Sequence, residues 1–172
     1  LTQLIKSYLA LKQVDKAKEK LNNTIKQQPK NIVAYNLLGG VYLSEKKFPE
    51  ALGEFKKALA IKPDWSMPYR MIAMTYHAQA NKADAIKTLQ DGIVATKASL
   101  DLVNDLAGFF HSNKEYDKAI AVYEEGYKHH PEALEALNNL VSYLTDFGDA
   151  AGLERAAKLA EPEWIIGENV KG

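Results

Sequence analysis

Three asparagines and one arginine recur along the chain at equal intervals. They are Asn36, Arg70, Asn104 and Asn138, and each directly follows a large apolar residue. A carboxamide has both donors and an acceptor, so it can pair with the N–H and C=O groups of an extended peptide without contacting the peptide's side chains. A row of such groups therefore predicts a surface that holds a peptide backbone. Asparagine is also tolerated on exposed helix faces that bind nothing, and the spacing alone leaves this second interpretation open.

The positions one and two turns further along carry small, flexible or titratable side chains. They include Gly40, Met74, Gly108, His77 and His111. Glycine inside a helix costs on the order of 1 kcal/mol relative to alanine, so glycines on this line indicate that another group approaches closely. That group is either a ligand or a neighbouring helix. Met74, with Met67 and Trp65 nearby, could form an adaptable apolar patch for a ligand side chain, although such residues more often lie in a core.

Other chemistries find little support in the sequence. The chain has no cysteine, which excludes a disulfide framework, a thiol nucleophile and a zinc–thiolate site. His129 and His130 are adjacent and would point about 100° apart on a helix, and His77 and His111 have no clear third ligand. No nucleophile elbow or phosphate-binding loop is present. We therefore predict no catalytic residue, no metal site and no cofactor.

The same interval governs the apolar and small positions that must support this row. Aromatic residues recur at Tyr8, Tyr42, Tyr76 and Phe110, and alanines at Ala17, Ala51, Ala85 and Ala119. Prolines close the units at Pro29, Pro63 and Pro131, and Lys97 occupies the place of the missing proline. A fixed period in the range of about 20 to 50 residues is typical of stacked repeat units such as helix pairs.

Single units combine these positions in a recognisable pattern. The second unit has Leu38, Gly39, Tyr42, Ala51, Phe55 and Pro63, and the fourth has Leu106, Ala107, Phe110, Ala119, Tyr123, Gly126 and Pro131. In this pattern the chain resembles the tetratricopeptide repeat family. The resemblance implies an all-α, right-handed solenoid of about five helix-turn-helix repeats. It also implies a concave groove lined by the first helix of each repeat, where the Asn36 row would lie, as in some members of the family.

The repeat positions predict one array over residues 1–172. Its units are 1–29, truncated at the N-terminus, then 30–63, 64–97, 98–131 and 132–161, whose second helix is degenerate, followed by 162–172. Trp164 and Ile165 in the last segment have two possible roles. They cap the array, because the exposed apolar face of a terminal repeat needs a cover, or they begin a truncated sixth unit. Since the chain begins inside a repeat, it looks like an excised domain.

Charge is balanced over the whole chain but not along it. Residues 1–62 hold 12 lysines and 5 acidic residues, a net charge of +7, whereas residues 63–172 have a net charge of −7. This asymmetry could orient a partner or favour head-to-tail contacts, or the lysines could simply lie on solvated outer faces. A neutral chain without interleaved surface aromatics does not favour nucleic acid binding. No apolar run is long enough for direct membrane insertion, and the compartment, cytoplasmic or periplasmic, stays open.

We therefore expect a protein-interaction scaffold, not an enzyme, that binds an extended segment of a partner protein in its groove. Two alternatives remain: self-association through the ends of the array, and a regulatory domain attached to an enzyme outside this sequence. The family's clamp for C-terminal carboxylates is disfavoured, because Gly40 replaces a required asparagine and Asp101 and Asp105 would repel a carboxylate.

Overall fold

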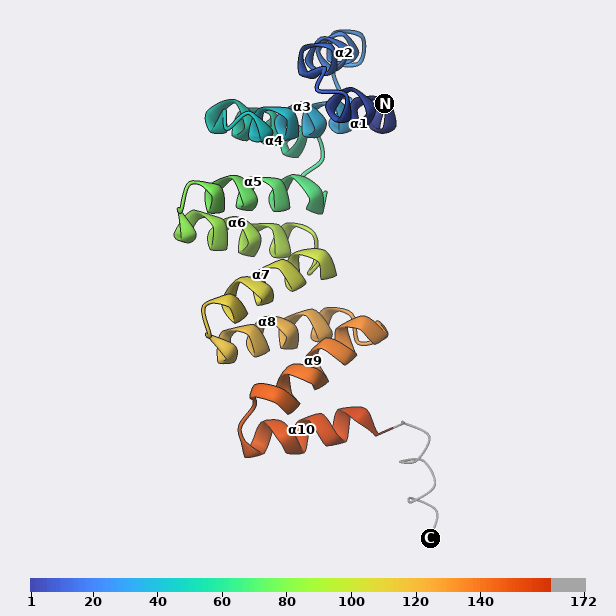
Figure 1. The fold of residues 1–172 in the computed structure, drawn as a ribbon. Helices are drawn as coiled ribbons and strands as arrows, with labels where there is room; N and C mark the ends of the chain where they lie inside the picture. The colour runs from blue at the N-terminus through green and yellow to red at the C-terminus, as the bar shows by residue number, and fades with distance from the viewer. Residues whose placement is uncertain (162–172) are drawn as a thin grey trace. The chain divides into compact units, whose positions relative to one another are not determined.

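The computed structural model describes residues 1–161, which form ten α-helices joined by short turns (Figure 1). The helices are α1 (Thr2–Ala10), α2 (Val14–Gln27), α3 (Ile32–Ser44), α4 (Phe48–Ile61), α5 (Ser66–Ala78), α6 (Lys82–Ala95), α7 (Leu100–Ser112), α8 (Tyr116–His129), α9 (Leu134–Phe147) and α10 (Ala150–Ala160). Each pair folds back on itself and packs against the next pair in its unit. The predicted all-α fold of about five sequential helix pairs is confirmed.

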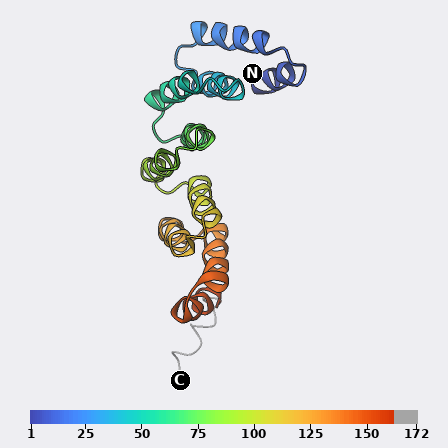
Figure 2. The ribbon, with the colours of Figure 1, turned by 60° about the vertical axis from the view of Figure 1, so that its left-hand side comes forward.

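The helices fall into two compact units, which we describe separately. Unit 1 is Leu1–Thr96 and contains α1 to α6; unit 2 begins at Lys97 and contains α7 to α10. In unit 1, α3 contacts α5 as well as its partner α4. In unit 2, α7 and α9 lie on one side and α8 on the other (Figure 2). The first helices of neighbouring pairs therefore share a face within each unit.

The turn inside a helix pair repeats with the same backbone geometry in four of the five pairs. It places one non-glycine residue in the left-handed region, at Lys12, Lys46, Ala80 and Lys114. The next N–H then donates back to the preceding helix, as from Lys47 to the Tyr42 carbonyl oxygen at 2.9 Å and from Glu115 to that of Phe110 at 2.9 Å. This bond satisfies a helix-end carbonyl and offsets the cost of the left-handed residue.

The fifth pair is joined differently. Gly148 has a φ of −74°, outside the left-handed region, and Asp149 caps α10 by accepting the Gly152 N–H at 2.9 Å. With this cap, α10 forms a helix of 11 residues with a narrow apolar face, shorter than α8 with its 14 residues.

Small residues lie where helices approach most closely. Ala51 and Ala119 are fully buried. A Cβ atom on Gly39 would lie 2.5 Å from the Phe55 ring, and one on Gly126 would lie 2.9 Å from Val103. Contacts this close cannot be accommodated without shifting a packed side chain, so these positions require small residues.

Two of the turns between pairs, those with Pro29 and Pro63, are tied by tyrosine hydroxyls. Tyr35 donates to the Pro29 carbonyl oxygen at 3.1 Å, and Tyr69 to that of Pro63 at 3.0 Å. At the turn without proline, Lys97 and Ala98 both adopt left-handed φ angles, and the Lys97 carbonyl oxygen instead accepts from His130 Nε2 at 3.1 Å. At this turn His130, which follows α8, thus takes the role that a tyrosine of the next helix has at the Pro29 and Pro63 turns.

Residues 162–172, including Trp164 and the predicted cap or sixth unit, lie outside the described residues. Among residues 1–161, none of the helices has the length and apolar character needed to span a membrane. This part of the chain also contains no group of three or more histidine, aspartate or glutamate side chains arranged to hold a metal ion.

Candidate functional site

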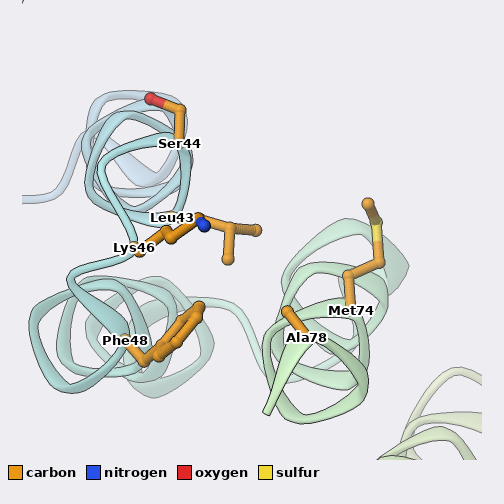
Figure 3. Close-up of a pocket in the computed structure, with 6 residues that line it drawn as sticks. All are labelled: Leu43, Ser44, Lys46, Phe48, Met74 and Ala78. Carbon is orange, nitrogen blue, oxygen red and sulfur yellow. The ribbon is translucent and has the colours of Figure 1, made fainter. Parts of the chain in front are cut away.

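An open hollow of about 540 Å³ lies in unit 1 between the α3–α4 turn and α5 (Figure 3). We call it the α3–α5 hollow, and its lining residues are Leu43, Ser44, Lys46, Phe48, Met74 and Ala78. Leu43 and Phe48 project toward α5, and Ala78 projects from α5 toward them. Met74 is 57% exposed, a large value for a methionine. Of the predicted peptide-binding residues, Met74 therefore lies at a surface with room for another molecule.

The residues that follow Met74 and Ala78 along α5 do not fill the hollow. Thr75 is fully buried, and its hydroxyl donates to the Met71 carbonyl oxygen at 2.7 Å. Gln79 donates from its side-chain amide to the Thr75 carbonyl oxygen at 3.2 Å. Both side chains thus bond back onto their own helix, a short-range pattern available to threonine and to flexible amides.

One lysine at the rim of the hollow is not neutralised. Among residues 1–161, no carboxylate lies within 4.0 Å of the Lys46 ammonium group. The adjacent Glu45 is already engaged, with Lys18 Nζ 3.0 Å from its Oε1 and Lys47 Nζ 3.3 Å from its Oε2. The hydrogen bond from Lys18 lowers the pKa of Glu45, and the same bond raises the pKa of Lys18. The rim therefore carries a positive charge that is available to a ligand.

The other predicted residues of unit 1 lie on α3 and α5 in different environments. Asn36 is half-buried, and its Oδ1 is covered and has no hydrogen-bond partner among the described residues. Arg70 is half-buried and His77 is exposed, and each already interacts with another group of the protein. Gly40 faces open space, since a Cβ there would meet nothing closer than the Met71 methyl group at 4.0 Å. Because its acceptor is covered, Asn36 offers a ligand only its amide donors.

In unit 2, Asn104 is part of a hydrogen-bonded link between α7 and α9. Its Nδ2 donates to Glu135 Oε1 at 2.8 Å, and its Oδ1 accepts from Asn139 Nδ2 at 2.8 Å. Both polar atoms of the Asn104 side chain are thus already engaged, which leaves a ligand one N–H and one oxygen lone pair. Gly108, one turn along, faces open space. The sequence pattern did not indicate this link, because Glu135 and Asn139 lie on the next helix pair.

Asn138 lines a different hollow, of about 630 Å³, between α8, α9 and α10. Its other lining residues include Tyr127, Pro131, Leu137, Val141 and Leu159. The structure therefore surrounds Asn104 and Asn138 with different elements, although they occupy equivalent positions in the repeat.

His111 belongs to an aromatic cluster in unit 2, made with Tyr116, Tyr143 and Phe147. Its ring packs edge-on at centroid distances of 5.5, 5.8 and 5.5 Å from these three rings, and its Nδ1 lies 3.2 Å from the Tyr143 hydroxyl. Tyr116 and Phe147 stack at 4.2 Å with an interplanar angle of 9°. Tyr143 also packs on Tyr123, where burial raises the pKa of Tyr123 to about 12. This cluster joins α7, α8 and α9. In the sequence, the aromatic residues Tyr143 and Phe147 are the signal for it, but they do not belong to the regularly repeated positions.

Comparisons with known proteins agree with this architecture. Residues 2–64 match the tetratricopeptide repeat family model. A curated relative, Hsp70-Hsp90 organizing protein 1 of Glycine max, is 26% identical over 162 residues, which cover 89% of this chain and 28% of that protein. The chain thus spans little more than a quarter of the length of this relative.

Solved structures with the same fold include three chains of similar size. A thermophilic TPR protein of Thermus thermophilus has a TM-score of 0.59 at 19% identity, covering 82% of this chain and 78% of its own. MamA has a TM-score of 0.58 at 21% identity, covering 97% and 95%. YrrB, described as a TPR protein with an unusual peptide-binding site, has a TM-score of 0.52 at 14% identity, covering 99% and 90%.

Arrays of this family generally mediate protein–protein interactions and are generally non-catalytic. The helix pairs, the left-handed turns and the regularly spaced buried alanines agree with the family match over residues 2–64. Residues 2–64 are therefore tetratricopeptide repeats, and the chain has the same fold as solved TPR proteins.

Proposed function

We propose that the chain is a protein-interaction module that binds an extended segment of a partner protein along α3 and α5 of unit 1. The observation that carries the proposal is the α3–α5 hollow, where apolar side chains border an open space of about 540 Å³. Binding pockets in proteins are usually concave, mostly apolar and about 300–1,000 Å³ in volume. Exposed apolar groups gathered at one place on a surface also mark interaction sites.

The residues beside the hollow suit a peptide backbone. The Asn36 amide group can donate to a peptide carbonyl, and Gly40 leaves the α3 surface open to close approach. Each such hydrogen bond contributes about 0.5–1.5 kcal/mol net. In unit 2 the equivalent Asn104 is occupied by Glu135 and Asn139, which favours unit 1 as the binding surface.

The curated relative organises Hsp70 and Hsp90 by its name, but the residues of this chain do not favour a clamp for a C-terminal carboxylate. Gly40 supplies no side chain on α3 for a carboxylate, and Asp101 and Asp105 carry negative charge on α7. We therefore propose an internal extended segment, without a free C-terminal carboxylate, as the ligand class.

A steric block on α3 tests the proposal. Peptides that bind the chain would first be found on an array of overlapping partner-derived or random sequences. Gly40→Gln then places a longer side chain in the open space on α3, where nothing lies closer than 4.0 Å to the added Cβ. We expect affinity for such a peptide to fall by tenfold or more, equivalent to about 1.4 kcal/mol.

Gly53→Gln is the matched control, because Gly53 lies on the second helix α4 and also has nothing within 4 Å of an added Cβ. Unchanged binding by Gly40→Gln, or an equal loss in both variants, would contradict a ligand on the α3–α5 surface.

Self-association is a second candidate, favoured by exposed leucines at the start of unit 1. Leu1, Leu4 and Leu11 are 40%, 40% and 66% exposed. A contact through these leucines would make the measured mass rise with protein concentration in analytical ultracentrifugation. Leu4→Lys should then abolish that rise while leaving peptide binding unchanged.

A further inference from the structure

The α3–α5 hollow has the chemistry of a side-chain pocket with a defined selectivity. We propose that it receives one large apolar side chain of the bound segment, and that Lys46 selects a segment with an acidic residue beside that side chain. This inference rests on the proposed function and specifies its ligand.

Four of the six lining residues present apolar groups. They are Leu43, Phe48, Met74 and Ala78, and they come from α3, α4 and α5. Met74 is unbranched and polarisable, so it can adjust its shape around different apolar ligands. An aliphatic or aromatic side chain entering the hollow would remove apolar surface of its own and of these residues from water. The hydrophobic effect therefore favours leucine- or phenylalanine-sized groups over glycine.

Charge favours an acidic neighbour for that side chain. Lys46 has no carboxylate within 4.0 Å among the described residues, although Lys18 and Lys47 share Glu45. Unit 1 as a whole holds 15 basic and 8 acidic residues, a net charge of +7. A segment carrying aspartate or glutamate would thus meet both a local unpaired ammonium group and a favourable long-range potential.

The equivalent place in unit 2 shows what would close such a pocket. His111, Lys114, Tyr116 and Asp146 occupy the positions of Leu43, Lys46, Phe48 and Ala78, two repeats later in the chain. There the rings of Tyr143 and Phe147 pack on His111 and Tyr116. Unit 1 has Thr75 and Gln79 at these two positions, and both bond back onto α5. Gln79 is therefore the residue whose size decides whether the hollow stays open.

The test uses short fluorescein-labelled serine peptides in which an aspartate stands on each side of one variable position. That position holds glycine, alanine, leucine or phenylalanine, and fluorescence anisotropy measures the dissociation constants. We expect the leucine and phenylalanine peptides to bind about tenfold more tightly than the glycine peptide. Replacing both aspartates by asparagines should weaken binding about two- to fivefold and reduce its dependence on salt.

Variants of the chain assign these effects to the hollow. Gln79→Phe should bring the ratio between leucine and glycine peptides close to one while leaving the affinity of the glycine peptide unchanged. Ala78→Gln, at an exposed position of the hollow's wall, provides a second filling variant with the same expected result. Lys46→Gln should remove the preference for aspartate. Lys114→Gln is its matched control, because Lys114 has the same left-handed backbone, with φ 61° against 60°.

The outcomes separate this inference from the proposed function. If Gly40→Gln blocks binding but the peptides show no preference for leucine or phenylalanine, the proposed function stands and the pocket assignment fails. If none of the peptides binds the unaltered chain, and array peptides also fail, both are wrong. If the apparent dissociation constant for the peptide rises with protein concentration, a second copy of this chain competes for the hollow, and this result would overturn the proposal.

Discussion

Two junctions between helix pairs share a backbone plan in this protein but differ in what fills them. In unit 1 the α3–α4 turn faces α5 across an open hollow lined by Leu43, Phe48 and Met74. In unit 2 the α7–α8 turn meets α9 through the stacked rings of Tyr116 and Phe147. Both turns carry a left-handed lysine, Lys46 or Lys114. The repeat therefore specifies the frame, and a few side chains decide whether a junction is packed or left available for a ligand.

The difference also separates two uses of equivalent polar positions. Asn104 in unit 2 is held between Glu135 and Asn139, whereas the Asn36 Oδ1 atom in unit 1 has no hydrogen-bond partner among the described residues. In unit 2, polar side chains are hydrogen-bonded between helix pairs in addition to the aromatic packing. A binding surface should therefore be sought where the packing is incomplete.

The largest expected effect tests the register on which the comparison depends. Ala51 and Ala119 are equivalent and fully buried, one in each unit. Ala51→Asp and Ala119→Asp each place an unpaired carboxylate where helices meet, which should cost several kcal/mol of folding free energy through overpacking and burial of charge. Thermal and urea denaturation followed by circular dichroism measure this loss. If both variants melt like the unaltered chain, the equivalence of the two junctions is wrong.

A second prediction opens the closed junction. Phe147→Gln gives unit 2 the residue that unit 1 has at this position and removes the stack on Tyr116 and the edge contact with His111. Loss of one aromatic pair beyond its buried area costs about 0.5–1.5 kcal/mol, so we expect the free energy of unfolding to fall by roughly that amount or more. Urea denaturation provides the measurement.

The reciprocal variant is the control for this exchange. Gln79→Phe should not destabilise unit 1, because the new ring can stack on Phe48 as Phe147 stacks on Tyr116. A stability loss in Gln79→Phe that equals or exceeds the loss in Phe147→Gln would show that the two junctions are not interchangeable.

A third prediction concerns the equivalent glycines Gly40 and Gly108. Neither has a heavy atom closer than 4.0 Å to an added Cβ, so alanine should be accommodated at both. Each substitution to alanine should raise the free energy of unfolding by about 0.5–1 kcal/mol, because glycine is the poorer helix former. If both variants gain stability and only Gly40→Ala loses peptide affinity, the ligand binds unit 1 alone. An equal loss of affinity in both variants would contradict this difference between the units.

The smallest effect is the pH dependence of one ion pair in unit 1, where Glu45 stands at the position that Asn113 occupies in unit 2. The Lys18 hydrogen bond lowers the pKa of Glu45, so its contribution to stability is present above the ordinary glutamate pKa and is lost as pH falls through the lowered value. The raised pKa of Lys18 keeps the pair charged up to alkaline pH. Glu45→Gln should therefore reduce the melting temperature at neutral pH and have no effect in strong acid. A difference that persists in acid would exclude the ion pair as its cause.

The helix pairs, the positions of their turns and the small buried residues can be predicted from the sequence alone. These features depend on short-range causes: a left-handed residue such as Lys46 bonds within its own turn, and Gly39 must be small wherever the repeat places Phe55 against it. A regular repeat interval makes each such cause visible several times in the chain.

The hydrogen-bond partners and packing of the candidate site residues depend on contacts between helix pairs, which the repeat pattern does not predict. Asn36 and Asn104 look alike in the repeat, but Asn104 is engaged by the side chains of Glu135 and Asn139 from the next helix pair. His111 is exposed, as its place in the repeat predicts, but its ring also packs edge-on against Tyr143 and Phe147 from that same pair.

Whether a junction is open depends on the summed volume and bonding of side chains from three helices. Gln79 bonds back onto α5, whereas Phe147 at the equivalent position stacks on Tyr116. The repeat pattern cannot predict this difference, because it describes only what the repeats have in common.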